Sequence, residues 1–357
     1  MEQKLRGFKM NIFAKKPFLI ADIGLNFYDI AQKENISQLE AVKLMIKEAK
    51  DCGIDAVKFG LFDEDAIFSL ELSQDNSAKT NASNELVKNL DEFGKSQYRE
   101  LTDFCNELGI VFLSTPFDFE SADFINEFVD YFMISSTDLT NIPFIKYIAS
   151  KNKPIILSTG ASTIREIKNA IRAIEDVSMV NIAIMHSVLS FPTYFEDANL
   201  LMIKDLADNF NDYDVGYSDH TICDENMLLL TTAFNYGAIV LEKHFTLDKS
   251  LNGDDHFHSM DPSDVIKFRK NLQFLSKING YKNKQPLICE SFMKKEFRKS
   301  IVSACDIKKG ETIKTSHITF KRPGTGISPE SLDDVLGKTA CENIPKGCLI
   351  SFEMLSD

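Results

Sequence analysis

The sequence has few of the features that mark secreted, membrane-bound or polyanion-binding proteins. Its seven cysteines are an odd number without a CxxC pair, the closest two being Cys341 and Cys348, so neither a disulfide framework nor a zinc knuckle is indicated. No apolar run approaches the roughly 18 residues that a membrane span requires. Basic residues are outnumbered, 40 Lys and Arg against 53 Asp and Glu, and the net charge is −13. This balance argues against broad electrostatic binding of nucleic acid or of an anionic membrane.

These absences indicate a protein of a reducing compartment. The basic N-terminus contains the apolar segment FLIA, which is too short for the core of a signal peptide. We therefore expect a cytoplasmic protein with neither a membrane nor a nucleic acid as partner. An anionic substrate must then be bound by a few well-placed cations.

Short β-rich runs alternate with helical patterns along most of the chain, which is typical of βα units around a parallel sheet. Eight such repeats in about 280 residues match the usual size of a TIM (β/α)8 barrel. A doubly wound open sheet is the alternative. The barrel is favoured because Ser, Thr and His gather where the runs end, and barrel enzymes build their active sites at that rim. The runs are FLIADIG (18–24), AVKFGLF (56–62), VFLSTPF (111–117), YFMISS (131–136), PIILSTG (154–160), NIAIMHS (181–187), VGYSDH (215–220) and IVLEKHFT (239–246).

Two segments depart from the βα pattern. Residues 63–95 are rich in Asp, Glu, Ser and Asn, and a loop of that length is either a lid or binding element at the catalytic rim or a solvated insertion without function. After a barrel domain over residues 1–280, residues 281–296 form a polar linker. Residues 297–357 change to short β-like pieces with Gly and Pro turns, which predicts a small mixed domain. This domain has a net charge of +1, so the acidity belongs to the rest of the chain.

Histidines are concentrated toward the end of the predicted barrel. Five of the six lie between its sixth strand and the segment after its eighth: His186, His220, His244, His256 and His258. His220 and His244 each close an apolar strand, so adjacent strands would direct both into one pocket. Imidazole is the commonest nitrogen ligand of divalent cations, and we interpret the pair as metal ligands. The alternative is that these histidines are ordinary buried residues whose hydrogen bonds are satisfied.

Two carboxylates accompany this histidine pair. Glu242 lies two residues before His244, on the same face of the strand, which suits a carboxylate that supports a metal ligand or activates water. Asp255, in the DDHFH stretch, is a candidate for binding a hydroxyl-rich substrate or for proton transfer. The alternatives are a charged residue of the barrel interior for Glu242 and a solvated loop for Asp255.

Lys58 lies inside the apolar run AVKFGLF. Because burying an uncompensated ammonium group is unfavourable, its position indicates anion binding in the mouth of the barrel. Serines and threonines at the ends of other strands add hydroxyl and backbone donors around a phosphate or carboxylate.

The chain resembles the sialic acid synthase family, which makes N-acetylneuraminic, legionaminic and pseudaminic acids. The matching motifs extend from FLIADIGLN through FLSTPFDFE, ISSTDLTNIPFIKYIA, PIILSTGAS, GYSDHT and LEKHFTLD to GDDHFHSMD and KRPGTGIS. The order and spacing of GYSDHT, EKHFT and KRPG are the most specific part of the match. The resemblance implies a TIM barrel followed by a small antifreeze-like (SAF) domain.

The resemblance also implies a reaction and its participants. Phosphoenolpyruvate adds through C3 to the aldehyde of an open-chain N-acyl hexosamine, and a Mn²⁺ or Mg²⁺ ion polarises the carbonyl. In this family the ion is held at the positions of His220 and His244. Asp22, Lys58 and Asp255 match catalytic positions. Matches to substrate-binding positions are Thr115, Ser136, Asp138, Ser158 and Ser218.

Arg322, in KRPG, matches an arginine that the antifreeze-like domain of the family extends into the sugar site of a partner subunit. The resemblance therefore implies a domain-swapped homodimer. From the residues alone, Arg322 is an exposed turn cation before Pro323.

Departures from the family pattern fall on the phosphoenolpyruvate side. Met133 stands where the family has a second lysine, and Gly60 replaces a glutamine. Asp22 stands where glutamate is usual, and Asp138 replaces an acid of the sugar site that is often glutamate. These changes keep two alternatives open: a paralogue that binds the sugar without condensing it with phosphoenolpyruvate, and another metal-dependent barrel aldolase with a different keto acid donor.

Overall fold

A computed structural model describes residues 17–61, 95–253 and 255–357. The chain divides into two compact units, with the division between Ile278 and Asn279. Of the loop predicted over residues 63–95, all but the last residue lies outside the described residues. No described helix combines the length and the apolar composition that a membrane crossing requires.

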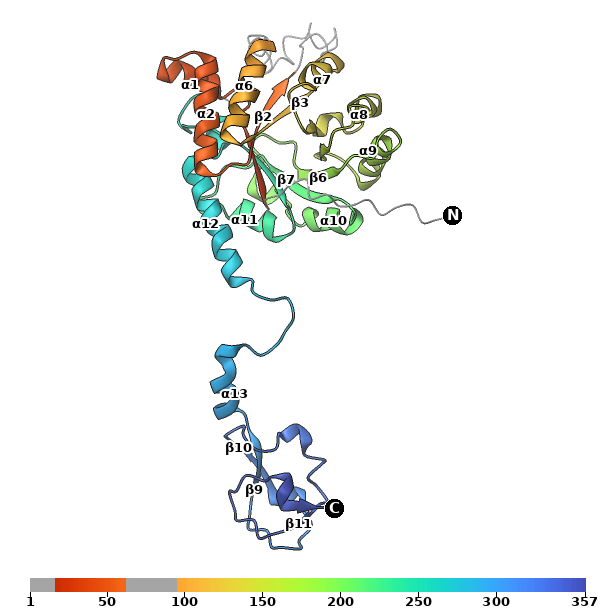
Figure 1. Ribbon diagram of the computed structural model, residues 1–357, viewed down its shortest axis with the longest axis vertical. Helices are drawn as coiled ribbons and strands as arrows, with labels where there is room; N and C mark the ends of the chain where they lie inside the picture. The colour runs from red at the N-terminus through yellow and green to blue at the C-terminus, as the bar shows by residue number, and fades with distance from the viewer. Residues whose placement is uncertain (1–16, 62–94, 254) are drawn as a thin grey trace. The chain divides into compact units, whose positions relative to one another are not determined.

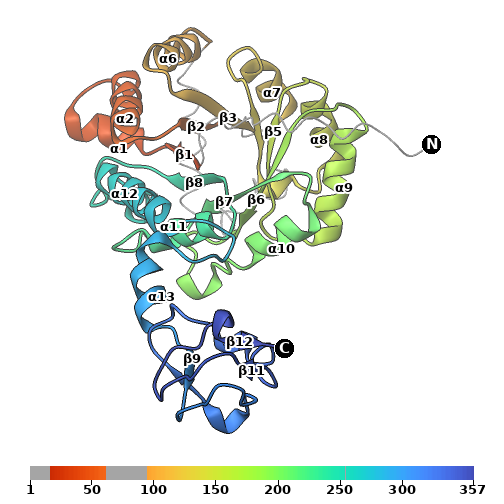
Figure 2. The same ribbon diagram turned by 60° about the horizontal axis from the view of Figure 1, so that its bottom comes forward.

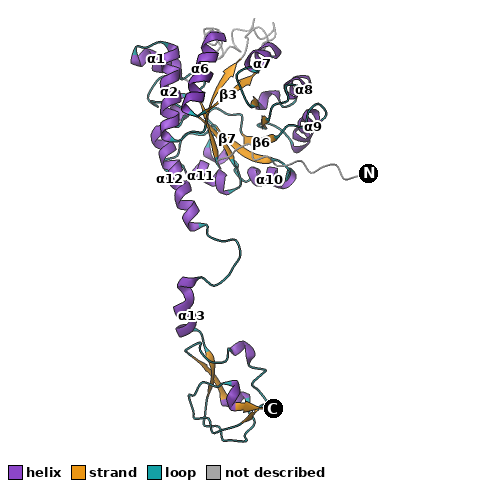
Figure 3. Ribbon diagram, in the orientation of Figure 1, coloured by secondary structure: helices purple, strands orange, loops and turns teal. Residues whose placement is uncertain are grey.

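The first unit is a closed barrel of eight parallel strands in chain order, which confirms the predicted TIM barrel. Figure 3 shows the strands enclosed by helices. The strands are β1 (Phe18–Asp22), β2 (Ala56–Leu61), β3 (Val111–Pro116), β4 (Phe132–Ile134), β5 (Ile155–Ser158), β6 (Ile182–Ser187), β7 (Asp214–Asp219) and β8 (Val240–His244).

Helices cover the outer face of the barrel (Figures 1 and 2). Local sequence sets where two of them begin, because α2 and α9 each start with a capping box, Ser37 with Glu40 and Thr163 with Glu166. The described helices are α1 (Phe27–Glu34), α2 (Gln38–Cys52), α6 (Lys95–Leu108), α7 (Phe119–Ile125), α8 (Ile142–Ala149), α9 (Ile164–Glu175), α10 (Met202–Asn209), α11 (Leu228–Asn235) and α12 (Pro262–Ile278).

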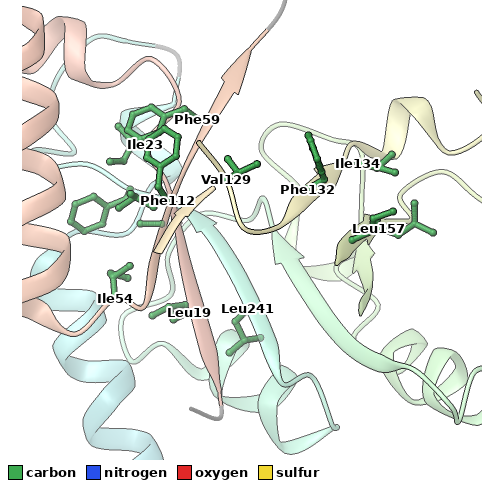
Figure 4. Close-up of a cluster of buried hydrophobic side chains, with 14 of the residues drawn as sticks. Leu19, Ile23, Ile54, Phe59, Phe112, Val129, Phe132, Ile134, Leu157 and Leu241 are labelled. Carbon is green, nitrogen blue, oxygen red and sulfur yellow. The ribbon is translucent and has the colours of Figure 1, made fainter. Parts of the chain in front are cut away.

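Alternate residues of the strands belong to two separate hydrophobic cores. The outer core lies between strands and helices and includes Leu19, Phe112 and Leu241 (Figure 4). The inner core contains only strand residues and their neighbours, among them Ile20 and Met133. Side chains of a strand alternate between its two faces, so the residues that continue the inner series toward the carboxyl ends point into the mouth of the barrel. This alternation positions the candidate site.

The second unit has a small core of its own, made mainly of isoleucines such as Ile301, Ile313 and Ile344. Its strands pair antiparallel, β9 with β10 and β11 with β12. The elements are α13 (Ser291–Phe297), β9 (Ser300–Ser303), β10 (Ile318–Lys321), β11 (Thr339–Ala340) and β12 (Leu355–Ser356).

Candidate active site

The inward side chains at the carboxyl ends of the strands line a cavity of about 290 Å³. This is the rim at which TIM barrels carry their active sites. Every predicted site residue of the barrel except Asp138 lines the cavity: Asp22, Lys58, Thr115, Ser136, Ser158, Ser218, His220, His244 and Asp255.

Strand register brings three of these residues together. Asp22, the last residue of β1, is in register with Lys58 on β2 and with His244 on β8. On β7 and β8, Ser218 is in register with Glu242. These residues therefore lie where the barrel closes, because β1 and β8 are its first and last strands and pair with each other.

Lys58 is held between two carboxylates. Its Nζ lies 2.7 Å from Oδ2 of Asp22 and also donates to Oε1 of Glu242. Burial alone would lower the pKa of Lys58, but Asp22 and Glu242 outweigh it and raise that pKa above its ordinary value. Burial raises the pKa of Asp22, yet the charges of Lys58 and then His244 lower it overall. Both groups are therefore charged at neutral pH.

His220 presents one ring nitrogen to the cavity because the other is engaged. Its Nδ1 lies 2.9 Å from the carbonyl oxygen of Val188, and a carbonyl only accepts, so Nδ1 carries the proton and Nε2 keeps a lone pair. Burial, followed by the neighbouring His244, lowers the pKa of His220 to about 4. The imidazole is thus neutral at pH 7, which is the state that binds metal.

His244 lies among groups that also suit a metal. Its ring centroid is 5.9 Å from that of His220 and 5.0 Å from that of His258. Its Nδ1 is 3.6 Å from Oδ2 of Asp255, and its Nε2 is 3.9 Å from Oδ2 of Asp22. Nδ1 of His244 is buried and has no hydrogen-bond partner among the described residues.

Hydroxyl groups line the cavity on the side of β3 to β5. Ser136 donates to Oγ of Ser158 at 2.8 Å and accepts from the backbone N–H of Gly160 at 2.8 Å. Oγ1 of Thr115 is buried without a hydrogen-bond partner in the described part of the chain. These groups can donate to an anionic oxygen.

Apolar side chains complete this side of the cavity. Met133 projects from β4 and is almost fully buried, and Leu189 and Phe191 contribute from the loop after β6. The Phe191 ring centroid lies 4.3 Å from that of His220. Lys58 is the one cationic side chain among the described residues that line the cavity.

Three residues considered from the sequence lie elsewhere. Asp138 is in a short 3₁₀ turn, Ser136–Asp138, where it accepts from the side chain of Asn141 at 3.0 Å and burial raises its pKa. Arg322 is exposed in the second unit, and its guanidinium lies 4.5 Å from the Phe297 ring centroid. His186 is a satisfied buried residue, since its Nε2 lies 2.9 Å from the carbonyl oxygen of Ala198.

Sequence reasoning missed a buried ion pair behind the site. Lys243 and Asp219 are 1% and 2% exposed and lie 2.9 Å apart. Lys243 also donates to the carbonyl oxygen of Thr221, whose backbone N–H donates to Asp219 at 2.9 Å. These bonds fix both residues that flank His220. The available signal was a charged residue at an outward strand position on each of two neighbouring strands.

The donor atoms of the cavity fit a divalent cation. Among the described residues that line the cavity, the carboxylates of Asp22, Glu242 and Asp255 face one lysine, so the charge of this lining favours a cation. Oε2 of Glu242 and Nδ1 of His244 are buried without hydrogen-bond partners among the residues described. Neutral imidazoles and carboxylates with open positions around them are typical of a catalytic metal centre.

Comparisons with known proteins show the family to which the chain belongs. Residues 45–284 match the NeuB family, and residues 298–356 match the SAF domain. The chain is 36% identical over 344 residues to N,N'-diacetyllegionaminic acid synthase of Campylobacter jejuni, a match that covers 94% of this chain and 99% of that protein. It is 32% identical over 361 residues to the synthase of the same name from Legionella pneumophila, with 98% of each chain covered.

A solved structure is similar as well. It is that of the N-acetylneuraminic acid (sialic acid) synthetase of Leptospira borgpetersenii, which is 28% identical, with a TM-score of 0.65 over 78% of this chain and 90% of that one. The chain belongs to the NeuB family of sialic acid synthase-like enzymes.

Proposed function

We propose that the protein condenses phosphoenolpyruvate with the aldehyde of an open-chain N-acyl hexosamine, such as N-acetylmannosamine or a 2,4-diacetamido sugar. The products are a nine-carbon sialic-acid-type sugar and phosphate. The observation that carries the proposal is a cavity whose described lining brings together two imidazoles, one lysine and three carboxylates, in a member of the NeuB family.

The proposed reaction forms one carbon–carbon bond and, at C2, replaces the carbon–oxygen bond to phosphate by a carbon–oxygen bond to the oxygen of water. C3 of phosphoenolpyruvate attacks the aldehyde carbon, whose oxygen becomes a hydroxyl group. Water adds at C2, and phosphate leaves with the oxygen that joined it to C2, so that C2 becomes a ketone. Of the two protons of water, one is balanced by the new hydroxyl group and the other by phosphate. Since two substrates must meet in one geometry, much of the rate enhancement comes from holding them together.

A divalent ion, Mn²⁺ or Mg²⁺, is proposed to bind at His220 and His244. When bound, it acts as a Lewis acid that polarises the acceptor carbonyl. The hydrogen bond from His220 to the Val188 carbonyl fixes the orientation of one ligand, as is usual for histidines that bind metals.

Lys58 and the hydroxyl groups are proposed to bind the anionic donor. Lys58 supplies a positive charge whose position is set by Asp22 and Glu242. Hydrogen bonds from Thr115, Ser136, Ser158 and Ser218 would orient the phosphate and carboxylate groups.

Two carboxylates are proposed to handle protons and hydroxyl groups. Oε2 of Glu242 has no hydrogen-bond partner in the described part of the chain, so this oxygen can accept the proton that water loses when it adds at C2. Asp255 lines the cavity beside His244, and we assign it to the hydroxyl groups of the sugar. Asp22 orients Lys58.

The proposed organisation of the chain follows the family resemblance. Residues 1–280 form the synthase domain, residues 281–296 the linker and residues 297–357 the SAF domain. In the proposed homodimer, Arg322 of each copy completes the sugar site of its partner, while Asp138 contributes to sugar binding.

The test is product analysis with the purified full-length chain. With Mn²⁺, phosphoenolpyruvate and a panel of 2-acetamido and 2,4-diacetamido hexoses, we expect one acceptor to yield phosphate and an equal amount of a nine-carbon acid by mass spectrometry. Absence of phosphate release with every acceptor would contradict the proposal.

A second candidate is a paralogue that binds sugar without condensing it, which the apolar environment of Met133 favours. Calorimetry separates the two: binding of sugar with no binding of phosphoenolpyruvate supports the paralogue, and binding of both excludes it.

A further inference from the structure

His258 is a buried histidine next to the candidate metal ligand His244. The residue is 1% exposed. Neither Nδ1 nor Nε2 has a hydrogen-bond partner among the residues that the structure describes. Buried polar atoms are nearly always paired, and an exception calls for an explanation such as a bound ion. A ligand on His258 would provide one.

The neighbouring His256 shows that the same turn can satisfy a histidine fully. The two residues begin and end one 3₁₀ turn, His256–His258. His256 is completely buried, with Nδ1 2.6 Å from Oγ1 of Thr246 and Nε2 3.1 Å from Oδ2 of Asp29. Because both of its nitrogens are engaged, His256 anchors the turn and has no lone pair to offer. The turn thus contains one structural and one unpaired histidine.

The unpaired ring faces groups that can share a cation with it. The ring centroids of His258 and His244 are 5.0 Å apart. Nε2 of His258 lies 3.5 Å from Oδ1 of Asp255. One ligand atom from each of His244, Asp255 and His258 lies within 4.8 Å of the others, which is close enough for all three to bind one ion after small side-chain adjustments.

We infer that His258 is a further ligand of the metal ion, next to His244 and in addition to His220. Asp255, whose Oδ1 faces His258, keeps its proposed role toward the sugar. The inference rests on the proposed function only for the expectation that an ion occupies this cavity. Its chemical consequence is selectivity. Magnesium prefers oxygen ligands and retains its water molecules, whereas imidazole suits the later first-row ions. An additional imidazole therefore favours a divalent transition-metal ion over Mg²⁺.

The test is metal binding by the full-length chain without substrates. The metal-free wild-type protein and the His258→Phe variant are titrated with Co²⁺ and with Mg²⁺ by calorimetry. Phenylalanine keeps the ring but removes both nitrogens. We expect Co²⁺ affinity to fall by roughly 100-fold, at the upper end of the loss that follows removal of an outer-shell partner, and Mg²⁺ affinity to change much less. His186→Phe, the same change at a buried histidine that does not line the cavity, should leave both affinities unchanged.

Each outcome bears on the inference. Equal Co²⁺ affinity of wild type and His258→Phe overturns it, as does the absence of Co²⁺ binding by wild type. If the variant does not fold, anomalous diffraction from wild-type crystals containing Zn²⁺ decides: a peak at about 2.0–2.1 Å from a His258 nitrogen supports the inference, and a peak beyond bonding distance of His258 contradicts it.

These measurements are independent of turnover. A wild-type protein that releases no phosphate, yet loses Co²⁺ affinity on His258→Phe, refutes the proposed function and leaves the ligand assignment intact. If the wild-type protein condenses both substrates but the variant keeps its Co²⁺ affinity, the proposed function is supported and the ligand assignment is refuted.

Discussion

The cavity has two chemically different halves. The charged half comes from β1, β2, β7 and β8 and carries Asp22, Lys58, His220, Glu242 and His244. The neutral half comes from β3 to β6 and the residues that follow these strands, and it carries Thr115, Met133, Ser136, Ser158 and Leu189. Groups that bind a metal or move protons therefore lie on one side. Apart from Ser218 on β7, the hydroxyl groups proposed to bind the donor lie on the other side, together with the apolar side chains. This asymmetry can orient two different substrates.

The charged half also keeps its groups in defined charge states. The pKa of Asp22 is lowered and that of Lys58 is raised, so both stay charged at neutral pH. Burial, the largest cause in each case, lowers the pKa of His220 to about 4 and that of His258, which lies beside His244, to about 3, so both stay neutral. This is the combination that a metal ion requires.

Among the substitutions that test the two halves, replacing His244 in the charged half should lower the catalytic rate most. Loss of an ion that supplies several kcal/mol of transition-state stabilisation lowers the rate by about 1,000-fold or more. We expect that reduction in acceptor-dependent phosphate release for His244→Gln. Activity within tenfold of wild type would show that the charged half does not depend on this ligand.

Breaking the buried ion pair of Lys243 and Asp219 by removing its lysine should destabilise the fold. Lys243→Met leaves Asp219 buried without its cation, and breaking such a pair lowers the free energy of unfolding by about 3–5 kcal/mol. Urea denaturation measures the loss. The double variant Lys243→Met with Asp219→Asn should recover most of it, and equal stability of single and double variants would contradict this account.

Removing Lys58 tests whether the charged half binds the donor. A lost charge-assisted hydrogen bond weakens binding by about 1.5–3 kcal/mol, which is roughly tenfold to a hundredfold. We expect Lys58→Met to raise the KM for phosphoenolpyruvate by that factor. The control is Lys47→Met, whose partner Asp51 lies with it on the surface. A rise confined to the KM of the sugar would assign Lys58 to the acceptor instead.

A substitution in the neutral half should change the kinetics least. Ser158→Ala removes the hydroxyl that accepts from Ser136, and one neutral hydrogen bond contributes about 1 kcal/mol, or roughly fivefold in KM for phosphoenolpyruvate. Steady-state kinetics with Ser276→Ala on α12 as the control checks this. A loss as large as that of His244→Gln would remove the distinction between the halves.

The sequence predicted the barrel because its strands follow simple local rules. Each β-rich run is short, apolar and followed by a helical pattern. These features can be recognised in the sequence without knowing which strands pair with one another. Register is different, since it depends on how neighbouring strands pack. The pairing of Asp219 with Lys243 could not be predicted for that reason.

The residues of the candidate site could be predicted where they lie at the carboxyl ends of strands. Asp22, Lys58, His220 and His244 line the cavity because they continue the inward series of their strands. Asp138 does not line it, since β4 ends at Ile134 and the chain turns before that residue.

The sequence could not show which of the two loop histidines is structural and which is available to bind a ligand. His256 and His258 lie two residues apart in HFH, and alternation does not decide between them in a 3₁₀ turn. The difference comes from the distant residues Thr246 and Asp29, which engage only His256.

The most direct test of the account is phosphate release by the wild-type chain under three conditions, with its acceptor and Mn²⁺, with a chelator, and with Mn²⁺ restored. The account predicts release that requires the acceptor, stops on chelation and returns with the ion. Release that continues after chelation, or that proceeds without an acceptor, would contradict a metal-dependent condensation in the charged half.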